Sequence, residues 1–186
     1  MDISKYEYVE HEKVNLIEIN IKHINQLFNS LDPSPFLEKD LDDDAFEYIV
    51  SSVSEHSMSR KHRIIIHMPI DQKKKISEHE IKKSIKHFFE YKKIIGEKNI
   101  RMKLQEGQLS FIVGSAFLTF CLLASNFISS HFNTIFANIV VEGLVIGGWV
   151  AMWKPISNIL YDWWPLHKEK QIFEKISKMD VEFKYS

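Results

Sequence analysis

The chain has few of the residues that crosslink or punctuate small soluble domains: its 186 residues include one cysteine, six glycines and five prolines. The single cysteine, Cys121, excludes an internal disulfide and a zinc site built on paired cysteines. The nine histidines form no HExxH motif, and the acidic run 40–44 lacks the central glycine and the terminal glutamate of a calcium loop. Phosphate-binding glycine loops, dinucleotide fingerprints and GxSxG motifs are also missing. Because all these motifs are absent, the sequence gives no sign of an enzyme. We expect no catalytic residues, no metal and no cofactor.

Charge is absent from one long tract. No Asp, Glu, Lys or Arg occurs from Gly107 to Val141, and Glu142 is then alone before a further uncharged run to Trp153. About 20 apolar residues in a helix cross the ~30 Å hydrocarbon core of a bilayer. The tract therefore predicts a transmembrane hairpin over 107–154, with spans at about 109–129 and 134–153. The rival interpretation, a re-entrant or buried helix pair inside a soluble protein, is disfavoured by the length of the tract.

The net charge of −1 hides an asymmetry between two segments. Residues 1–56 hold 4 Lys/Arg against 13 Asp/Glu, whereas residues 72–103 hold 11 Lys/Arg against 4 Glu. A basic segment next to the membrane suits the anionic cytoplasmic leaflet. Because no aromatic stacking platform or groove-reading motif accompanies this segment, we expect no nucleic-acid partner.

Basic residues flank the two spans on one side only. The connector Ser130–Asn133 contains no Lys or Arg. The flanking basic residues are Lys92, Lys93, Lys98, Arg101 and Lys103 before the first span, and Lys154, Lys168 and Lys170 after the second. The positive-inside rule then predicts a multi-pass protein of the inner membrane with both termini in the cytoplasm. The polar, acidic start Met1–His23 predicts no cleavable signal peptide.

The flanks predict a small mixed soluble part. Residues 14–21 and 63–68 are rich in β-branched residues and read as strands. A helix opened by the aspartates of 40–44 and ending near His56 separates them. That helix, with an apolar stripe at Phe46, Ile49, Val50 and Val53, makes a parallel βαβ pairing plausible and leaves a mixed sheet open.

The remaining elements complete the predicted fold class, an α+β membrane protein. Ser77 and Glu80 form a capping-box pattern at the start of a long helix that enters the membrane near Gly107. Its buried face is expected at Ile81, Ile85, Phe88 and Ile95. Residues 181–185 read as a last, edge strand. The predicted segments are a cytoplasmic α/β segment (1–75), a basic helix (76–106), the transmembrane hairpin (107–154), and an interfacial helix with a cytoplasmic C-terminal tail (155–186).

Proline and aromatic residues follow the second span. Pro155 is expected to end or kink that span. Beyond it, Ile156, Ile159, Leu160, Trp163 and Trp164 share one helical face, which predicts a short amphipathic helix at the headgroup level. The residues Tyr161, Asp162, Trp163 and Trp164 are therefore functional candidates. The alternative is that the aromatic residues fill a soluble core. A closing helix over 168–179 is expected to turn Leu166, Ile172, Phe173 and Ile176 inward.

Glu142 is the most informative single residue, because a carboxylate near mid-span costs several kcal/mol unless it is protonated, paired or hydrated. Asn138 lies one turn earlier on the same face and is the nearest candidate donor; Thr119, Ser125 and Asn126 of the first span are others. One interpretation makes Glu142 a proton, cation or partner site. The other makes it a neutral, hydrogen-bonded contact between the two spans.

Small residues recur every four positions at Gly143, Gly147 and Ala151. Such a pattern allows close approach of helices in membranes, and it indicates packing or self-association.

The motif Leu31-Asp32-Pro33-Ser34-Pro35-Phe36 and the stretch from Glu142 to Pro155, continued by Leu160–Leu166, resemble small bacterial two-span inner-membrane proteins. The resemblance covers about residues 24 to 182. It implies a two-span protein with a cytoplasmic α/β portion and supplies no activity.

Three functions were compared. The leading hypothesis is a non-enzymatic interaction or accessory protein of the lipid bilayer, bound to a second copy or to another membrane protein. The alternative is an oligomeric ion- or proton-conducting assembly that uses Glu142. The third is a lipid-active enzyme at the cytoplasmic surface that uses Asp162 or a histidine.

Overall fold

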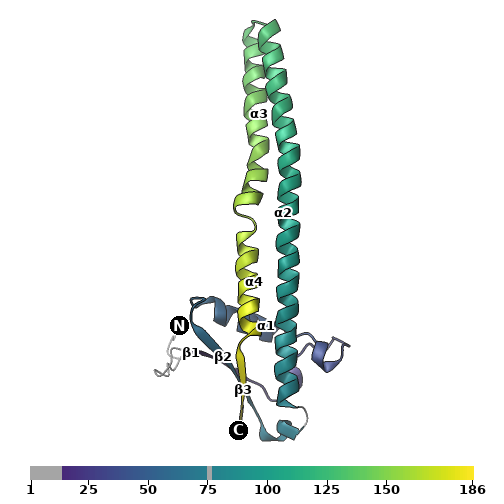
Figure 1. Cartoon of the computed structure of the whole chain (residues 1–186), viewed down its shortest axis with the longest axis vertical. Coiled ribbons are helices and arrows are strands. Elements are labelled where there is room, and N and C mark those ends of the chain that lie inside the picture. Colours follow the sequence, from purple (N-terminus) through teal and green to yellow (C-terminus); the bar gives the residue numbers. More distant parts are fainter. Residues whose placement is uncertain (1–13, 75–76) are drawn as a thin grey trace. The chain divides into compact units, whose positions relative to one another are not determined.

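The structure, a computed structural model, describes residues 14–74 and 77–186. Figure 1 labels its helices and strands, which in chain order are β1 (Val14–Asn20), α1 (Asp43–Ser54), β2 (Lys61–Met68), α2 (Glu78–His131), α3 (Ile135–Leu160), α4 (Trp164–Ser177) and β3 (Asp180–Tyr185). Short 3₁₀ turns cover Ile24–Gln26, Phe36–Glu38 and Ile70–Lys74. The chain divides into two compact units, described separately below. Unit 1 comprises Met1–Ile95 and Glu169–Ser186, and unit 2 comprises Gly96–Lys168.

Unit 1 is built on a three-stranded, fully parallel sheet in the order β1-β2-β3. Ile17 pairs with Ile64, and Ile64 with Val181, so the apolar positions of the three strands are in register. The predicted parallel pairing of the first two strands is confirmed, and the mixed sheet is not formed. The predicted last strand is confirmed as an edge strand.

One face of this sheet carries the core. Alternate strand residues point to it because successive side chains of a strand face opposite sides. The buried members are Ile17, Ile19, Ile64, Ile66, Met68 and Val181 from the strands, and Ile49, Val53, Ile81, Ile85, Phe88, Phe89, Ile172, Phe173 and Ile176 from α1, α2 and α4. The opposite face carries ion pairs, including Arg63–Glu182 at 2.9 Å and Lys184–Glu18 at 3.9 Å.

Helix α1 begins where the aspartates predicted it. Asp42 is the N-cap, and its side chain accepts a hydrogen bond from the backbone N–H of Asp44. This bond satisfies one of the helix's free N–H groups, and the carboxylates suit the positive end of the helix dipole. The predicted apolar stripe is confirmed, since Ile49 and Val53 are buried while Phe46 and Val50 pack against the same core.

The start of α2 also follows the sequence pattern. The backbone N–H of Ser77 donates to Glu80 Oε2 over 3.4 Å, which is half of the predicted capping box. The inward positions Ile81, Ile85 and Phe88 are confirmed as buried, whereas Ile95 is only half-buried. The sequence analysis missed Phe89, which has no exposed surface.

Unit 2 contains the apolar parts of α2 and α3. Helix α2 ends at His131, and α3 begins at Ile135 with Thr134 as its N-cap. Two helical stretches, Glu78–His131 and Ile135–Ser177, are long and apolar enough to cross a membrane, with windows of mean hydropathy 2.0 and 1.8. Only 17% of each window is buried, whereas the core helix of a soluble protein is mostly buried. The two stretches are therefore candidate membrane spans.

Pro155 does not end the second apolar helix. Helix α3 continues through Pro155 to Leu160, and the chain turns over 161–163 before α4. The separate amphipathic helix predicted after Pro155 is therefore not formed. In particular, Asn158 faces inward at 4% exposure, whereas Ile156 and Ile159 are exposed. The proline ring packs at Gly114 of α2.

Candidate functional site

The contact between α2 and α3 fixes which side of α3 is free. Gly148, Met152 and Pro155 of α3 lie against α2. They belong to, or lie beside, a row of buried or half-buried residues: Ala137, Val141, Leu144, Gly148, Ala151, Pro155 and Asn158. Their spacing alternates between four and three residues, as in the seam of a left-handed coiled coil. Figure 1 shows the two helices side by side in this unit.

Three glycines lie in this contact. A Cβ at Gly148 would lie 2.9 Å from Leu118 Cδ1 and 3.2 Å from Cys121 Cβ. A Cβ at Gly114 would lie 3.1 Å from both Met152 Sδ and Pro155 Cγ, and one at Gly107 would lie 3.2 Å from Ile159 Cγ1. These distances are tighter than ordinary van der Waals contact, so the two helices approach through their glycines.

Gly143 and Gly147 lie outside this contact. A Cβ at either position would have no atom within 4 Å. These two glycines miss the contact because residues spaced by four do not follow its repeat. A step of four residues rotates 40° around a helix, so the row Gly143–Gly147–Ala151 drifts away from a seam whose average period is 3.5 residues. Of this row, only Ala151 belongs to the seam.

Glu142 and Asn138 are also exposed on the side away from α2. Among residues 14–74 and 77–186, no hydrogen bond joins Glu142 to Asn138 or to the first-span candidates Thr119, Ser125 and Asn126. Thr119 instead donates to the backbone oxygen of Ser115 over 2.8 Å. Glu142 therefore does not link the two helices of one chain, and the hydrogen-bonded contact predicted between the spans is not formed. The residue is adjacent to the seam position Val141, from which it is rotated by 100°.

The free side of α2 has a different composition. Its exposed residues in the apolar region include Leu109, Phe111, Ile112, Val113, Phe117, Phe120, Leu122, Leu123 and Phe127. Such large apolar side chains suit lipid tails. The free side of α3 also has large apolar residues, but it differs in carrying the Glu142 carboxyl group, the Asn138 carboxamide, and open space at Gly143 and Gly147. We call Asn138, Glu142, Gly143 and Gly147 the outer α3 patch.

The aromatic candidates gather at the turn after α3. Trp163 donates its indole N–H to the backbone oxygen of Ile159 over 2.9 Å, and its ring centroid lies 6.1 Å from that of Trp164. Asp162 Oδ2 accepts from Lys154 Nζ over 3.2 Å, and Asp162 Oδ1 accepts from Ser157 Oγ over 3.4 Å. Tyr161 and Trp164 are exposed. Asp162 thus serves an ion pair that joins the end of α3 to the turn, which gives no support to a catalytic role.

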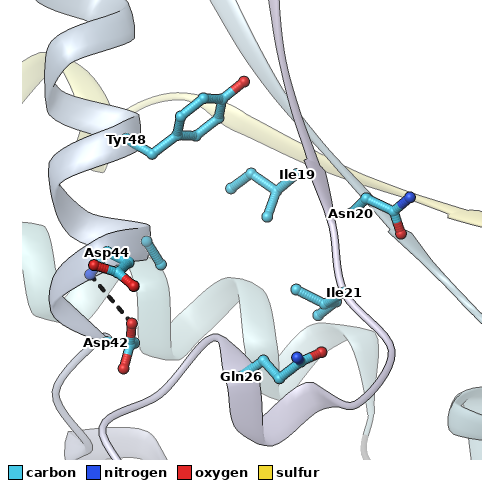
Figure 2. Close-up of a pocket in the computed structure, with 8 residues that line it drawn as sticks. Ile19, Asn20, Ile21, Gln26, Asp42, Asp44 and Tyr48 are labelled. Atoms are coloured by element: carbon cyan, nitrogen blue, oxygen red, sulfur yellow. Dashed lines mark hydrogen bonds between the residues drawn. The ribbon is translucent and has the colours of Figure 1, made fainter.

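Unit 1 has a shallow pocket that the sequence analysis missed. It has a volume of about 430 Å³ and is lined by Ile19, Asn20, Ile21, Gln26, Asp42, Asp44, Ala45 and Tyr48. Figure 2 shows that α1, the end of β1 and the following turn supply these side chains. The Asp42 carboxylate is already engaged by the backbone of α1, and Tyr48 donates to the backbone oxygen of Glu18 over 3.2 Å. The pocket carries no assembled acid, base and nucleophile.

A second feature missed in unit 1 is a buried group of basic side chains. His62 Nδ1 lies 3.0 Å from the backbone oxygen of Arg60, and its Nε2 lies 3.5 Å from Asn15 Nδ2. In the neutral tautomer that carries its proton on Nδ1, His62 can donate to the Arg60 oxygen and accept from the Asn15 carboxamide. The His56 ring lies 5.8 Å away. Lys175 Nζ is shielded from solvent and has no hydrogen-bond partner. In the described part of the chain, no three His, Cys, Asp or Glu side chains could together hold a metal ion.

This group predicts loss of stability in acid. Burial, followed by the charge of Lys175, lowers the pKa of His62 below its usual 6.5, and burial lowers the pKa of Lys175. The unfolded chain therefore takes up a proton on His62 near pH 6.5 while the folded chain resists it, so stability falls as the pH falls below about 6.5. We expect Lys175→Met to raise the melting temperature by several degrees, because it removes a shielded, unpaired amine, and to weaken the acid effect.

The measurement is thermal unfolding of detergent-solubilised protein between pH 5 and 8, in which the susceptibility of unit 1 to a protease monitors the unfolding. His79→Asn is the matched control, since His79 is exposed on α2. An identical pH profile for Lys175→Met and the unaltered chain would show that the two basic groups are not coupled.

Comparison with known proteins adds no identity. No protein-family model, no curated protein and no solved structure matches this chain. The resemblance to small bacterial two-span proteins therefore stays a prediction.

Proposed function

We propose that this chain is a non-enzymatic interaction protein of the inner membrane. In this proposal α2 and α3 form a transmembrane hairpin, unit 1 is a small cytoplasmic domain, and the outer α3 patch binds another membrane-spanning helix. The observation that carries the proposal is the exposure of Glu142 on a helix apolar enough to cross a bilayer. A carboxyl group facing lipid tails costs several kcal/mol, so a protein partner that satisfies it is favoured over lipid.

The orientation of the hairpin follows from the distribution of basic residues. In α2, Lys98, Arg101 and Lys103 precede the apolar region, and Lys154 and Lys168 follow it in α3 and α4. The three residues that connect α2 and α3 are Phe132, Asn133 and Thr134, none of which is basic. This asymmetry supports an orientation with both termini in the cytoplasm and the connector outside.

Cysteine labelling tests this orientation. In a Cys121→Ser background, we expect a cysteine introduced by His131→Cys to react with a membrane-impermeant maleimide added to the outside of intact cells. Arg101→Cys, in the exposed basic part of α2, is the control and should react only after the cells are opened. Reaction of the His131→Cys variant only from the cytoplasmic side would overturn the orientation.

Photo-crosslinking tests the interaction itself. Ile146 on α3 and Phe120 on α2 are equally exposed, at 62% and 64%. With a photoreactive amino acid at each position in native membranes, we expect a protein adduct of defined mass from Ile146 and only lipid adducts from Phe120. Glu142→Leu should reduce the yield of the Ile146 adduct several-fold. Equal protein labelling at the two positions, or lipid adducts alone at both, would contradict the proposal.

A further inference from the structure

The partner of the outer α3 patch can be specified by its chemistry, on the basis of the proposed function above. We infer that it is a second copy of this chain. The two α3 helices run parallel around a two-fold axis along the membrane normal, and the Glu142 carboxyl group of each copy exchanges hydrogen bonds with the Asn138 carboxamide of the other.

The hydrogen-bonding groups of the patch are complementary to themselves. No Lys or Arg occurs between Gly107 and Trp153, so a second copy has no cation to offer at this depth. Asn138 has two N–H donors and a carbonyl acceptor, and a protonated carboxyl group has one donor and one acceptor. A carboxamide and a carboxylic acid therefore satisfy each other with two hydrogen bonds. Within one chain, Asn138 and Glu142 are both exposed and are not bonded to each other.

The positions of the two residues match this exchange. Helical side chains tilt toward the N-terminus of their helix, so a residue covers the turn before its own Cα. Both side chains tilt this way, but the Glu142 side chain is longer by one methylene group, so its carboxyl group can reach back toward the Asn138 carboxamide, one turn earlier in α3. Two copies inserted in the same orientation hold equivalent residues at equal depth. The Glu142 side chain of one copy can therefore meet Asn138 of the other without any shift along the helix axis.

The surface of α3 also permits the close approach that this exchange needs. At Gly143 and Gly147 a Cβ would have no atom of the same chain within 4 Å, so these two hollows stay open to a neighbouring helix. Parallel helices that meet at such small residues form isologous pairs, in which each surface contacts its own copy. The large apolar side chains on the free side of α2 are then left to lipid.

A foreign helix with a Lys or Arg is the main competing partner. It would neutralise Glu142, but a cation has no acceptor for the N–H donors of the Asn138 carboxamide. The second copy uses both polar groups of the patch.

Energy transfer between two labelled populations of the full chain, reconstituted in vesicles of phosphatidylethanolamine and phosphatidylglycerol, measures the pairing. We expect Glu142→Leu and Asn138→Leu each to weaken association about 3- to 15-fold, the range for hydrogen bonds between membrane helices. Glu142→Gln should retain association, because a carboxamide offers the same donor and acceptor. Gly143→Leu should weaken it, whereas Ala116→Leu, at an exposed position of α2, should not.

The outcomes separate this inference from the proposed function. A chain that stays monomeric in the vesicles, or association that both leucine variants leave unchanged, overturns the second copy as partner. If the Ile146 adduct in native membranes persists in that case and is lost in Glu142→Gln, the partner is a basic helix and the proposed function stands. If the adduct is also missing, both are wrong.

Discussion

Phe89→Ala is expected to destabilise unit 1 by about 3–5 kcal/mol, the usual range for truncating a fully buried aromatic residue. Phe89 has no exposed surface and lies against three other rings, with centroid distances of 6.0 Å to Phe46, 5.3 Å to Phe88 and 6.3 Å to Phe173. These rings come from α1, α2 and α4, so the cavity left by alanine opens where all three helices meet. Domains of this size are stable by roughly 5–15 kcal/mol, so the loss is a large fraction of the total.

Amide hydrogen exchange of the solubilised full chain measures this effect, because the strands of unit 1 should lose protection together. Tyr91→Ala is the matched control, since Tyr91 lies two residues further along α2 and is 52% exposed. It should change protection by less than ~0.5 kcal/mol. Comparable losses for the two variants would show that Phe89 does not hold the core.

Gly148→Leu is expected to disrupt the pairing of α2 with α3, at a cost of about 1–3 kcal/mol or more, the range for overpacking. Leu118 Cδ1 can rotate away from an added methyl group. However, Cys121 Cβ at 3.2 Å and Leu118 Cα at 3.5 Å are fixed by the α2 backbone. A leucine side chain therefore has no room unless the helices separate.

Gly147→Leu is the matched control for this contact. Gly147 is the residue next to Gly148, and a Cβ at Gly147 has no atom of the chain within 4 Å. All four tryptophans lie between positions 149 and 164, within unit 2, so their fluorescence reports this unit during unfolding in a denaturing detergent. The experiment is done on dilute monomers in detergent, where pairing of copies does not contribute. Equal loss of stability in the two variants would mean that the observed seam of α3 is not the one that packs.

Much of unit 1 could be predicted because its signals are local. The β-branched runs at 14–20 and 63–68 alternate or lie between turn residues, and the aspartates of 42–44 mark a helix start by their preference for free N–H groups. The four-residue apolar stripe of α1 (Phe46, Ile49, Val50 and Val53) identifies its buried side before any partner is known. Phe89 was missed because it lies beside the main stripe of α2 and is covered only when α4 is in place.

The candidate site on α3, in contrast, could not be predicted from local sequence signals. The sequence alone determined that the chain contains two long, uncharged helical stretches with a single acid, Glu142, inside the second, because length and charge are properties of the chain itself. It did not determine which side of α3 meets α2, because a helix that is apolar on all sides has no stripe to mark its buried face. Tertiary packing decided this through the glycines at 107, 114 and 148, which bring the backbones close and leave Glu142, Gly143 and Gly147 outside. Packing also carried α3 through Pro155 and brought Lys175 into the group around His62, since both depend on residues far away in the chain.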